Sequence, residues 1–526
     1  MQRRVRPGSG LLLLGVLSSL LLPVSGAVGL SAPLPGADAS SVPLDEQARR
    51  AASGTFREFV EFLALPNVEI SPEDIRKNAA WLEVAFARRG FLVRQLPNGG
   101  RPMVFADFPE RKAGAKTVLF YIHFDGQAVT PSEWKQESPW KATLKKRTPA
   151  GWETLPLDLL YGMDVDPEWR LFARSASDDK GPILMFLAAI DALRASGTAP
   201  AVHVKVILDS QEEKDSPTIT RVVSENLGLL AADAVVVLDG PRHETDRPTL
   251  AFGNRGILKV TLRVFGARGE LHSGHYGNYV PNPAQRLAAL LASMKDEDGR
   301  VVIPGFYDGV VLDEATKRIL AAVPDDEAAL RKRLGIAATD KVGATYQESL
   351  QYPSLNVRGL LASDVGAKVR TVVPASAVAE IDIRTVPETP ADRLQALLTR
   401  FVESKGWRLV NGAPTDEERA RYPKLASLTF GDVSLQSRPA RTDPDAPIGR
   451  WLTAALTRTF GAEPVRIRMM GGTVPTRALV DPLNAPFAQL PLVNPDNAQH
   501  AADENLRIGN YIDGVKTLIG VLTQPF

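Results

Sequence analysis

Short apolar runs and a helical repeat alternate along the first half of the chain. Residues 118–122, 202–208 and 234–238 are apolar runs of strand length, and each predicts a buried strand. Between the first two runs, apolar residues recur at helical spacing just after a Gly-Pro pair: Ile183, Leu184, Leu187, Ile190 and Leu193. Strands that alternate with helices predict the α/β class, with a mainly parallel sheet flanked by helices.

The pattern changes between residues 249 and 440. Residues 258–264 and 378–383 alternate between apolar and polar positions, as half-exposed strands do, and leucines near 287–291 mark an amphipathic helix between them. This predicts a smaller α+β domain. The candidate ligands described below lie on both sides of it, so we expect one discontinuous catalytic domain, 46–248 plus 441–526. Residues 249–440 would be inserted into that domain.

The N-terminus has the layout of a cleaved secretory signal. Three arginines within the first six residues precede an apolar stretch at 11–22, which Pro23 ends before a run of small residues. We predict a signal peptide at 1–27, a linker at 28–45 and secretion across the inner membrane, with the periplasm as the expected location. The alternative is a retained membrane anchor, but the stretch is shorter than the roughly 20 residues that a span needs.

Composition narrows the chemistry. A chain of 526 residues is long enough for two domains. Its net charge of +1 offers no field that would attract nucleic acid, so we expect no nucleic-acid partner. The chain has no cysteine, which excludes disulfides, thiol nucleophiles and thiolate ligands. Any bound metal must therefore be held by nitrogen and oxygen.

Acidic residues and histidines gather where predicted strands end or helices begin. The set consists of His123, Asp125, Asp178, Glu212, Glu213, Asp239 and, near the C-terminus, His500. Side chains that follow the carboxyl ends of parallel strands can meet in one cleft. Imidazole and carboxylate together suit Zn, Mn or Co, and a dinuclear hydrolase also needs a base that is not a ligand. The set predicts a two-metal hydrolase site.

Each of these motifs is weak evidence alone. The pair His123 and Asp125 also fits a polar strand edge, and Asp178 with Asp179 also fits a turn with a helix cap. Two adjacent acids are usually a solvated face. Here they follow a buried strand, so one could hold a metal while the other accepts a proton from water. The chain contains neither an H-E-x-x-H zinc motif nor a G-x-S-x-G nucleophile elbow.

The combination is more specific than its parts, and it resembles the M20 family of metallopeptidases, in particular its carnosinase and cytosolic nonspecific dipeptidase branch. The motifs stand in family order across nearly all of the chain that follows the signal. Four further blocks are similar to that branch: residues 352–355 (YPSL), 371–374 (TVVP), 382–387 (DIRTVP) and 471–475 (GGTVP).

The resemblance implies a role for each metal-site residue. His123 and Asp239 would hold one ion, and Glu213 and His500 the other. Asp178, joined to Asp179 by a cis peptide bond, would bridge the two ions. Glu212 would be the general base, and Asp125 would orient His123. We expect two divalent ions per chain, with zinc as the first choice and Mn or Co as alternatives.

The resemblance also implies substrate contacts. Arg384 would bind the substrate carboxylate, and Thr371, Gly472 and Thr473 would line the pocket. The resemblance makes the inserted domain, 249–440, a lid and dimerisation domain. His272 of this lid would polarise the scissile carbonyl in the site of a neighbouring subunit, which requires a homodimer. Three segments depart from the family pattern without removing a ligand, and they bear on substrate choice: 172–175, 211–215 and 500–504.

The sequence thus predicts a dinuclear metal-dependent hydrolase that cleaves dipeptides or short peptides with a free C-terminal carboxylate. An N-acyl-amino-acid amidohydrolase of the same fold would use the same site, so the motifs leave it open. A catalytically inactive peptide-binding protein is a further alternative, but such a protein would have no need of a base at Glu212.

Overall fold

The computed structural model describes residues 42–162 and 164–526, and Pro43–Phe526 form one compact unit. The predicted signal peptide and most of the predicted linker lie outside the described residues. The end of that linker is helical, because α1 begins at Leu44. Among the described residues, no helix has both the length and the apolar composition needed to cross a membrane.

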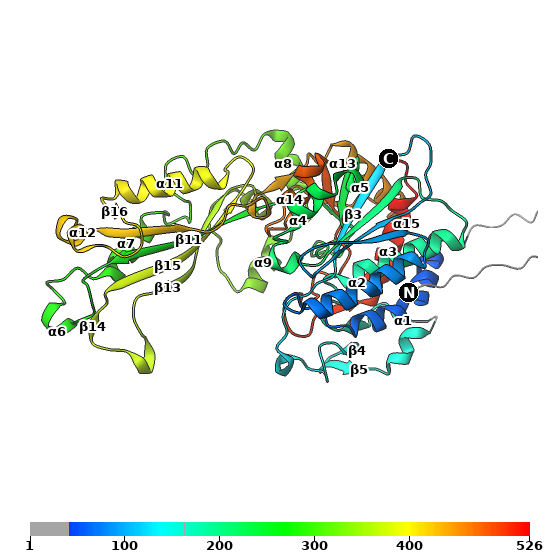
Figure 1. The fold of residues 1–526 in the computed structure, drawn as a ribbon, viewed down its shortest axis with the longest axis horizontal. Coiled ribbons are helices and arrows are strands. Elements are labelled where there is room, and N and C mark those ends of the chain that lie inside the picture. Colours follow the sequence, from blue (N-terminus) through cyan, green and yellow to red (C-terminus); the bar gives the residue numbers. More distant parts are fainter. Residues whose placement is uncertain (1–41, 163) are drawn as a thin grey trace, which may run out of the picture. The chain divides into compact units, whose positions relative to one another are not determined.

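An eight-stranded sheet carries the predicted α/β pattern (Figure 1). The three apolar runs form β3, β7 and β8, and these strands run parallel, with β20 parallel to β8. Antiparallel strands extend the sheet on both sides. In spatial order the strands are β1 (Leu92–Leu96), β2 (Met103–Asp107), β7 (His203–Asp209), β3 (Thr117–His123), β8 (Ala234–Val237), β20 (Phe487–Gln489), β9 (Thr249–Ala251) and β19 (Val465–Ile467).

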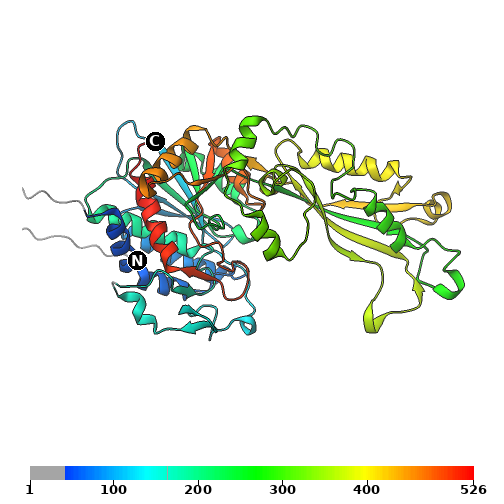
Figure 2. The ribbon, with the colours of Figure 1, turned by 180° about the vertical axis from the view of Figure 1, so that it is seen from behind.

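Helices cover both faces of this sheet because successive side chains of a buried strand point in opposite directions. Phe120 of β3 packs into one core, formed with α1 (Leu44–Leu63), α2 (Pro72–Ala87), α3 (Lys180–Ala195), α13 (Pro447–Phe460) and α15 (Ile508–Leu522). Its neighbour Tyr121 packs into the other, formed with α4 (Ile219–Glu225), α5 (Leu227–Leu230) and α14 (Thr476–Leu483). In Figure 2 α15, in red, runs beside α1, in blue, where Tyr511 stacks on Phe59.

A four-stranded antiparallel sheet was not predicted from the sequence. It consists of β21 (Asn505–Arg507), β6 (Arg170–Phe172), β4 (Thr143–Thr148) and β5 (Gly151–Thr154), in that order. The pairing of β21 with β6 joins segments more than 300 residues apart, with Asn505 opposite Phe172. It thereby brings the loop that carries His500 beside the loop that carries Asp178.

A five-stranded sheet forms the predicted α+β region. Its order is β13 (Ser354–Leu361), β15 (Ser376–Thr385), β11 (Gly256–Phe265), β17 (Leu425–Phe430) and β16 (Arg408–Leu409). Alternate residues of β11 are buried against α7 (Pro283–Ala292) and α11 (Ala391–Ser404), as the alternating pattern predicts. The limits of the inserted domain stay a prediction, and β9, which begins at residue 249, belongs to the large sheet.

Shorter elements complete the described chain. They are β10 (Gly253–Asn254), β12 (Leu271–His272), α6 (Ser273–Tyr276), α8 (Glu314–Ala321), α9 (Glu327–Leu334), α10 (Tyr346–Ser349), β14 (Val372–Val373), α12 (Asp416–Arg421) and β18 (Ala440–Arg441), besides single turns of 3-10 helix. Two of these elements, α9 and α10, contribute to a cavity discussed below.

Candidate metal centre

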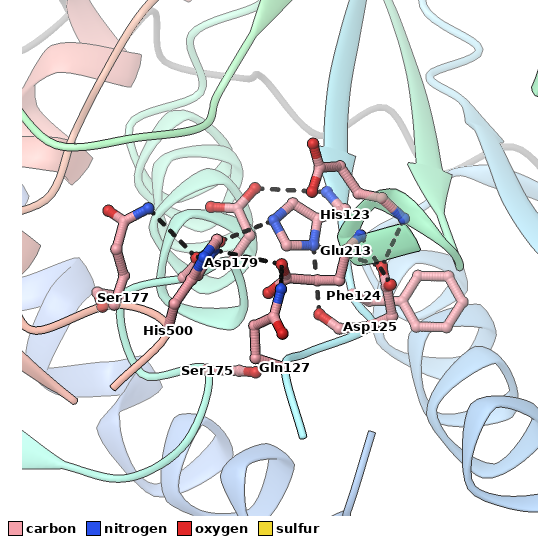
Figure 3. A network of polar contacts seen from close by, with 12 residues as sticks. His123, Phe124, Asp125, Gln127, Ser175, Ser177, Asp179, Glu213 and His500 are labelled. Carbon is pink, nitrogen blue, oxygen red and sulfur yellow. Dashed lines mark hydrogen bonds and ion pairs between the residues drawn. The ribbon is translucent and has the colours of Figure 1, made fainter. Parts of the chain in front are cut away.

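The predicted ligands form one cluster, of which Figure 3 shows His123, Glu213 and His500. His123 is the last residue of β3, and Asp239 follows β8 by two residues. Asp178 stands just before α3, and Glu213 lies in a 3-10 turn, Glu212–Lys214, that follows β7. His500 comes from the C-terminal loop. The parallel strands β3, β7 and β8 place His123, Glu213 and Asp239 at one edge, as expected for an open α/β sheet, and the loop between β6 and α3 adds Asp178.

Asp178 lies between the two histidines. Its Oδ1 is 2.9 Å from Nε2 of His123, and its Oδ2 is 3.0 Å from Nε2 of His500. His500 Nε2 also lies 3.3 Å from Oε2 of Glu213. Ligand atoms of His123, Asp178 and Asp239 lie within 4.8 Å of one another, and so do those of Asp178, Glu213 and His500. The peptide bond between Asp178 and Asp179 is cis.

The charges of this cluster fit divalent cations. Burial raises the pKa of Glu213 to about 8 and that of Asp239 to about 6. Burial acts in the same direction on Asp178, but hydrogen bonds to His123 and His500 hold the pKa of that carboxyl well below its usual range. Carboxylates crowded in this way are stabilised by a cation. The nitrogen and oxygen donors present are those that Zn, Mn and Co accept.

Asp125 contacts both parts of the site: it lies beside the His123 imidazole, as expected, and also bonds to the turn of the two adjacent acids. Its carboxylate accepts hydrogen bonds from the backbone N–H groups of Glu212, at 3.0 Å, and Glu213, at 3.1 Å. Nδ1 of His123 lies 3.2 Å from the backbone carbonyl oxygen of Asp125 and 3.4 Å from its Oδ1. Asp125 therefore fixes the turn that carries the two acids as well as the imidazole.

Glu212 differs from its neighbour in its surroundings. Glu213 accepts a hydrogen bond from Nε2 of Gln127 at 2.7 Å, whereas no side chain in the described part of the chain donates to the carboxyl of Glu212. Burial raises the pKa of Glu212 well above its ordinary value, and the nearby charges of Asp239 and Glu213 add to this effect. A carboxyl of this kind can take up a proton.

Sequence reasoning missed Glu504, which is fully buried. Its carboxylate accepts hydrogen bonds from Nη1 of Arg174 at 2.6 Å and from the backbone N–H groups of Ser175, Ser177 and Asp178 at 2.9–3.0 Å. Glu504 therefore shapes the loop that presents Asp178. The acid was visible only as the fourth residue after His500, because its partners lie more than 320 residues away.

Asp209 was also missed. It is the last residue of β7, and its carboxylate accepts hydrogen bonds from the hydroxyl of Tyr121 at 2.9 Å and from the backbone N–H of Gln211 at 3.1 Å. These bonds hold the turn between β7 and Glu212. An acid at the end of an apolar run was the signal that could have revealed it.

The predicted substrate contacts lie in two groups. On β15, Arg384 donates from Nη1 to Oγ1 of Thr473 at 2.7 Å, beside the exposed Gly472. Thr371 lies next to the strand pair of β12 with β14, where its carbonyl accepts a hydrogen bond from Ser273. His272, on β12, is exposed. Within residues 42–162 and 164–526, no hydrogen bond or ion pair joins His272 or Thr371 to the metal-site cluster.

Replacement of Glu504 tests whether it positions Asp178. In Glu504→Gln, one acceptor oxygen becomes an NH₂ group that faces N–H donors, so the 174–178 loop should shift. We expect divalent-metal affinity, measured by competition with a chelating dye, to fall roughly 10- to 100-fold, as for other residues that orient ligands. Asp503→Asn, next to Glu504 but bonded to the backbone of Lys135, should keep wild-type affinity. Equal affinity in all three proteins would contradict the role.

Metal affinity should rise with pH. Hydrogen bonding to Asp178 raises the pKa of His500 to about 9, and burial raises that of Glu213 to about 8, so both carry a proton in the metal-free protein at neutral pH. Because ligands bind metal when deprotonated, affinity should increase from pH 6 to pH 9, and binding should release protons that an indicator dye detects. His203→Asn, outside the cluster, should leave this slope unchanged. A flat profile would argue against these two residues as ligands.

Comparison with known proteins places this site in a family. The model of Peptidase family M20/M25/M40 matches residues 119–524. The Cys-Gly metallodipeptidase dug1 of Schizosaccharomyces pombe is 27% identical over 407 residues, which cover 76% of this chain and 78% of that protein. The Beta-Ala-His dipeptidase of Homo sapiens is 26% identical over 435 residues, covering 80% and 78%.

A solved structure has the same fold. That of an M20 family metallo-carboxypeptidase from Sulfolobus solfataricus matches with a TM-score of 0.69 at 26% identity, over 89% of this chain and 98% of that one. The resemblance seen in the sequence motifs is thereby confirmed. The chain belongs to peptidase family M20/M25/M40 and is a metallopeptidase.

Proposed function

We propose that the protein is a dinuclear dipeptidase that hydrolyses dipeptides or short peptides with a free C-terminal carboxylate. The observation that carries the proposal is the position of Asp178, which belongs to both ligand groups, together with the neighbouring half-buried Glu212, whose carboxyl accepts no hydrogen bond from a side chain in the described part of the chain. The two relatives described above are both named as dipeptidases, which favours a dipeptide as substrate over an N-acyl amino acid.

The residues around Asp178 divide the work. His123 and Asp239 would hold one ion, Glu213 and His500 the other, with Asp178 between them. Two bound ions, zinc first and Mn or Co as alternatives, would acidify a water molecule and polarise the scissile carbonyl.

Glu212 accepts the proton of the attacking water at its carboxyl and passes it to the leaving amine nitrogen. A pKa raised toward the working pH suits a group that must both take up and return a proton. The backbone bonds from Glu212 and Glu213 to Asp125 keep the two acids in fixed directions, so that one serves as ligand and the other as base.

Arg384 orients the substrate through its carboxylate. A guanidinium can form two parallel hydrogen bonds to a carboxylate. The guanidinium of Arg384 also donates to Oγ1 of Thr473, and this bond helps to orient it. Asp382 lies 3.6 Å from Nε of Arg384, so part of the positive charge is already balanced. An amidohydrolase acting on N-acyl amino acids would use the same arginine, and only an assay on both substrate types separates the two activities.

A homodimer would supply the remaining contact. The exposed His272 and its neighbour Thr371 make no contact with the metal cluster in the described part of the chain. Strand β13 lies at the edge of its sheet, and the apolar side chains of Leu360 and Leu361 on it are 60% and 67% exposed. Edge strands with exposed apolar side chains pair readily with a second copy. In this proposal the partner's lid brings its histidine to the scissile carbonyl.

We also propose secretion to the periplasm. This proposal rests only on residues 1–27, which have the layout of a cleaved signal peptide.

An activity assay tests the proposed reaction. The metal-loaded protein should hydrolyse free dipeptides, and removal of the metal by a chelator should abolish turnover until a divalent ion is restored. Glu212→Gln preserves shape but cannot take the proton, so kcat should fall about 10²- to 10⁴-fold. Its metal content, measured by elemental analysis, should match the wild type.

The matched control is Glu213→Gln, which should lose metal. If Glu212→Gln loses metal while Glu213→Gln retains both ions, the two acids have been assigned in the wrong order. Turnover of N-acetyl amino acids with no turnover of dipeptides would replace the proposal with the amidohydrolase alternative.

Subunit mixing tests the dimer. His272→Ala and Glu212→Gln should each be inactive alone, but a heterodimer contains one site with an intact base and an intact partner histidine. We expect the mixture to recover part of the wild-type rate after exchange, toward about a quarter for random pairing with one repaired site in half of the dimers.

Exchange itself is followed with subunits that carry different affinity tags. If exchange is demonstrated and the mixture stays inactive, His272 acts within its own chain or plays no part in catalysis.

A further inference from the structure

A cavity of about 510 Å³ lies among α9, the segment that leads into α10, and the start of β13. None of the candidate metal ligands lines it. One of its lining residues is Arg255, which stands between β10 and β11 and whose side chain is largely withdrawn from solvent. The volume is in the range of small-molecule sites.

Arg255 is buried without a carboxylate partner. It is 7% exposed, its Nη2 donates to Oγ of Ser354 at 2.8 Å, and its buried Nε has no hydrogen-bonding partner. In the described part of the chain no acidic side chain lies within ion-pair distance of its guanidinium. Burial, and after it the positive charge of Arg384, lower the pKa of Arg255 to about 10. A buried cation in this state lacks its counter-ion.

The other charged residues of the cavity already have partners. Lys295 lies 3.3 Å from Asp340, Arg331 lies 3.8 Å from Glu327, and Arg333 lies 3.1 Å from Glu244 outside the cavity. One positive charge is therefore left unbalanced. A single negative charge balances it, which favours a carboxylate over a phosphate dianion.

Part of the cavity wall is apolar. Val301 and Leu355 are buried in its wall. Leu334, Ile336 and Tyr346 also line it and are 59%, 42% and 44% exposed. Large apolar side chains that gather in this way around a pocket are typical of ligand sites.

We propose that this cavity binds a small monocarboxylate with an apolar body, with the carboxylate on Arg255 and the body against α9 and Val301. The site is separate from the candidate metal centre and does not depend on the proposed peptidase activity. It adjoins the segment expected to line the substrate pocket, because the backbone N–H of Arg255 donates to the carbonyl of Gly472 at 3.1 Å.

Calorimetric titration of the metal-loaded protein tests the proposal, with 4-phenylbutyrate, hexanoate and benzoate as probes. At least one should bind, its uncharged amide should not, and inorganic phosphate should not displace it. Arg255→Met should weaken the probe roughly 10- to 100-fold, the usual worth of a charge-assisted hydrogen bond. Its melting temperature should not fall, because the substitution removes an unbalanced buried charge.

A second variant tests the cavity without changing the buried Arg255. Leu334→Asp places a negative charge on an exposed residue of the cavity and should also weaken the probe, whereas Leu227→Asp, at an exposed position of α5 that does not line the cavity, should not. Binding should be the same after the metal is removed. The proposal is overturned if no probe binds, if Arg255→Met binds as the wild type does, or if binding requires the metal.

Discussion

Glu504 accepts hydrogen bonds from Arg174 and from three backbone N–H groups of the loop that ends at Asp178. Asp178 in turn contacts both histidines of the site. The buried carboxylate of Glu504, near the C-terminus, therefore sets the position of Asp178, which follows β6. Burial raises the pKa of Glu504, while the charge of Arg174 opposes that shift and favours the ionised form. The candidate metal centre depends on these hydrogen bonds, which join two parts of the chain that are far apart in sequence.

The residues that suit metal binding in this site also repel one another in the folded protein. Five carboxylates and two histidines share one small volume, and burial raises the pKa of most of these acids. Without cations the protein relieves the repulsion by keeping protons on some of them, such as Glu213. Bound ions would replace those protons, so metal binding would also contribute to the stability of the folded state. The candidate metal centre thus contains more negative charge than the surrounding protein groups neutralise.

The two arginines near the Gly471–Thr473 segment show how surroundings assign different tasks to one residue type. Arg384 is partly exposed, lies near Asp382 and contacts Thr473. This arrangement leaves it free to meet a carboxylate that comes and goes. Arg255 is buried, has no carboxylate within ion-pair distance among the described residues and lines a partly apolar cavity. The positive charge of Arg255 is therefore less well compensated than that of Arg384, so we expect Arg255 to retain a bound anion.

The sequence by itself determined the local features. Apolar runs and their periods predicted β3, β7, β8, α3 and β11, because burial of a strand or helix face leaves a regular pattern in the chain. The positions of His123, Glu212 and Glu213 at strand ends followed from the same pattern, and the order of the motifs was enough to reveal the family.

Tertiary structure decided what depends on contacts between distant residues. The pairing of β21 with β6, the role of Glu504 and the isolation of Arg255 leave no local pattern, because each rests on a partner, or on the absence of one, far along the chain. Whether a carboxylate holds a loop or a guanidinium lacks a counter-ion is set by which groups surround it in space. Neighbours in sequence carry no record of that environment.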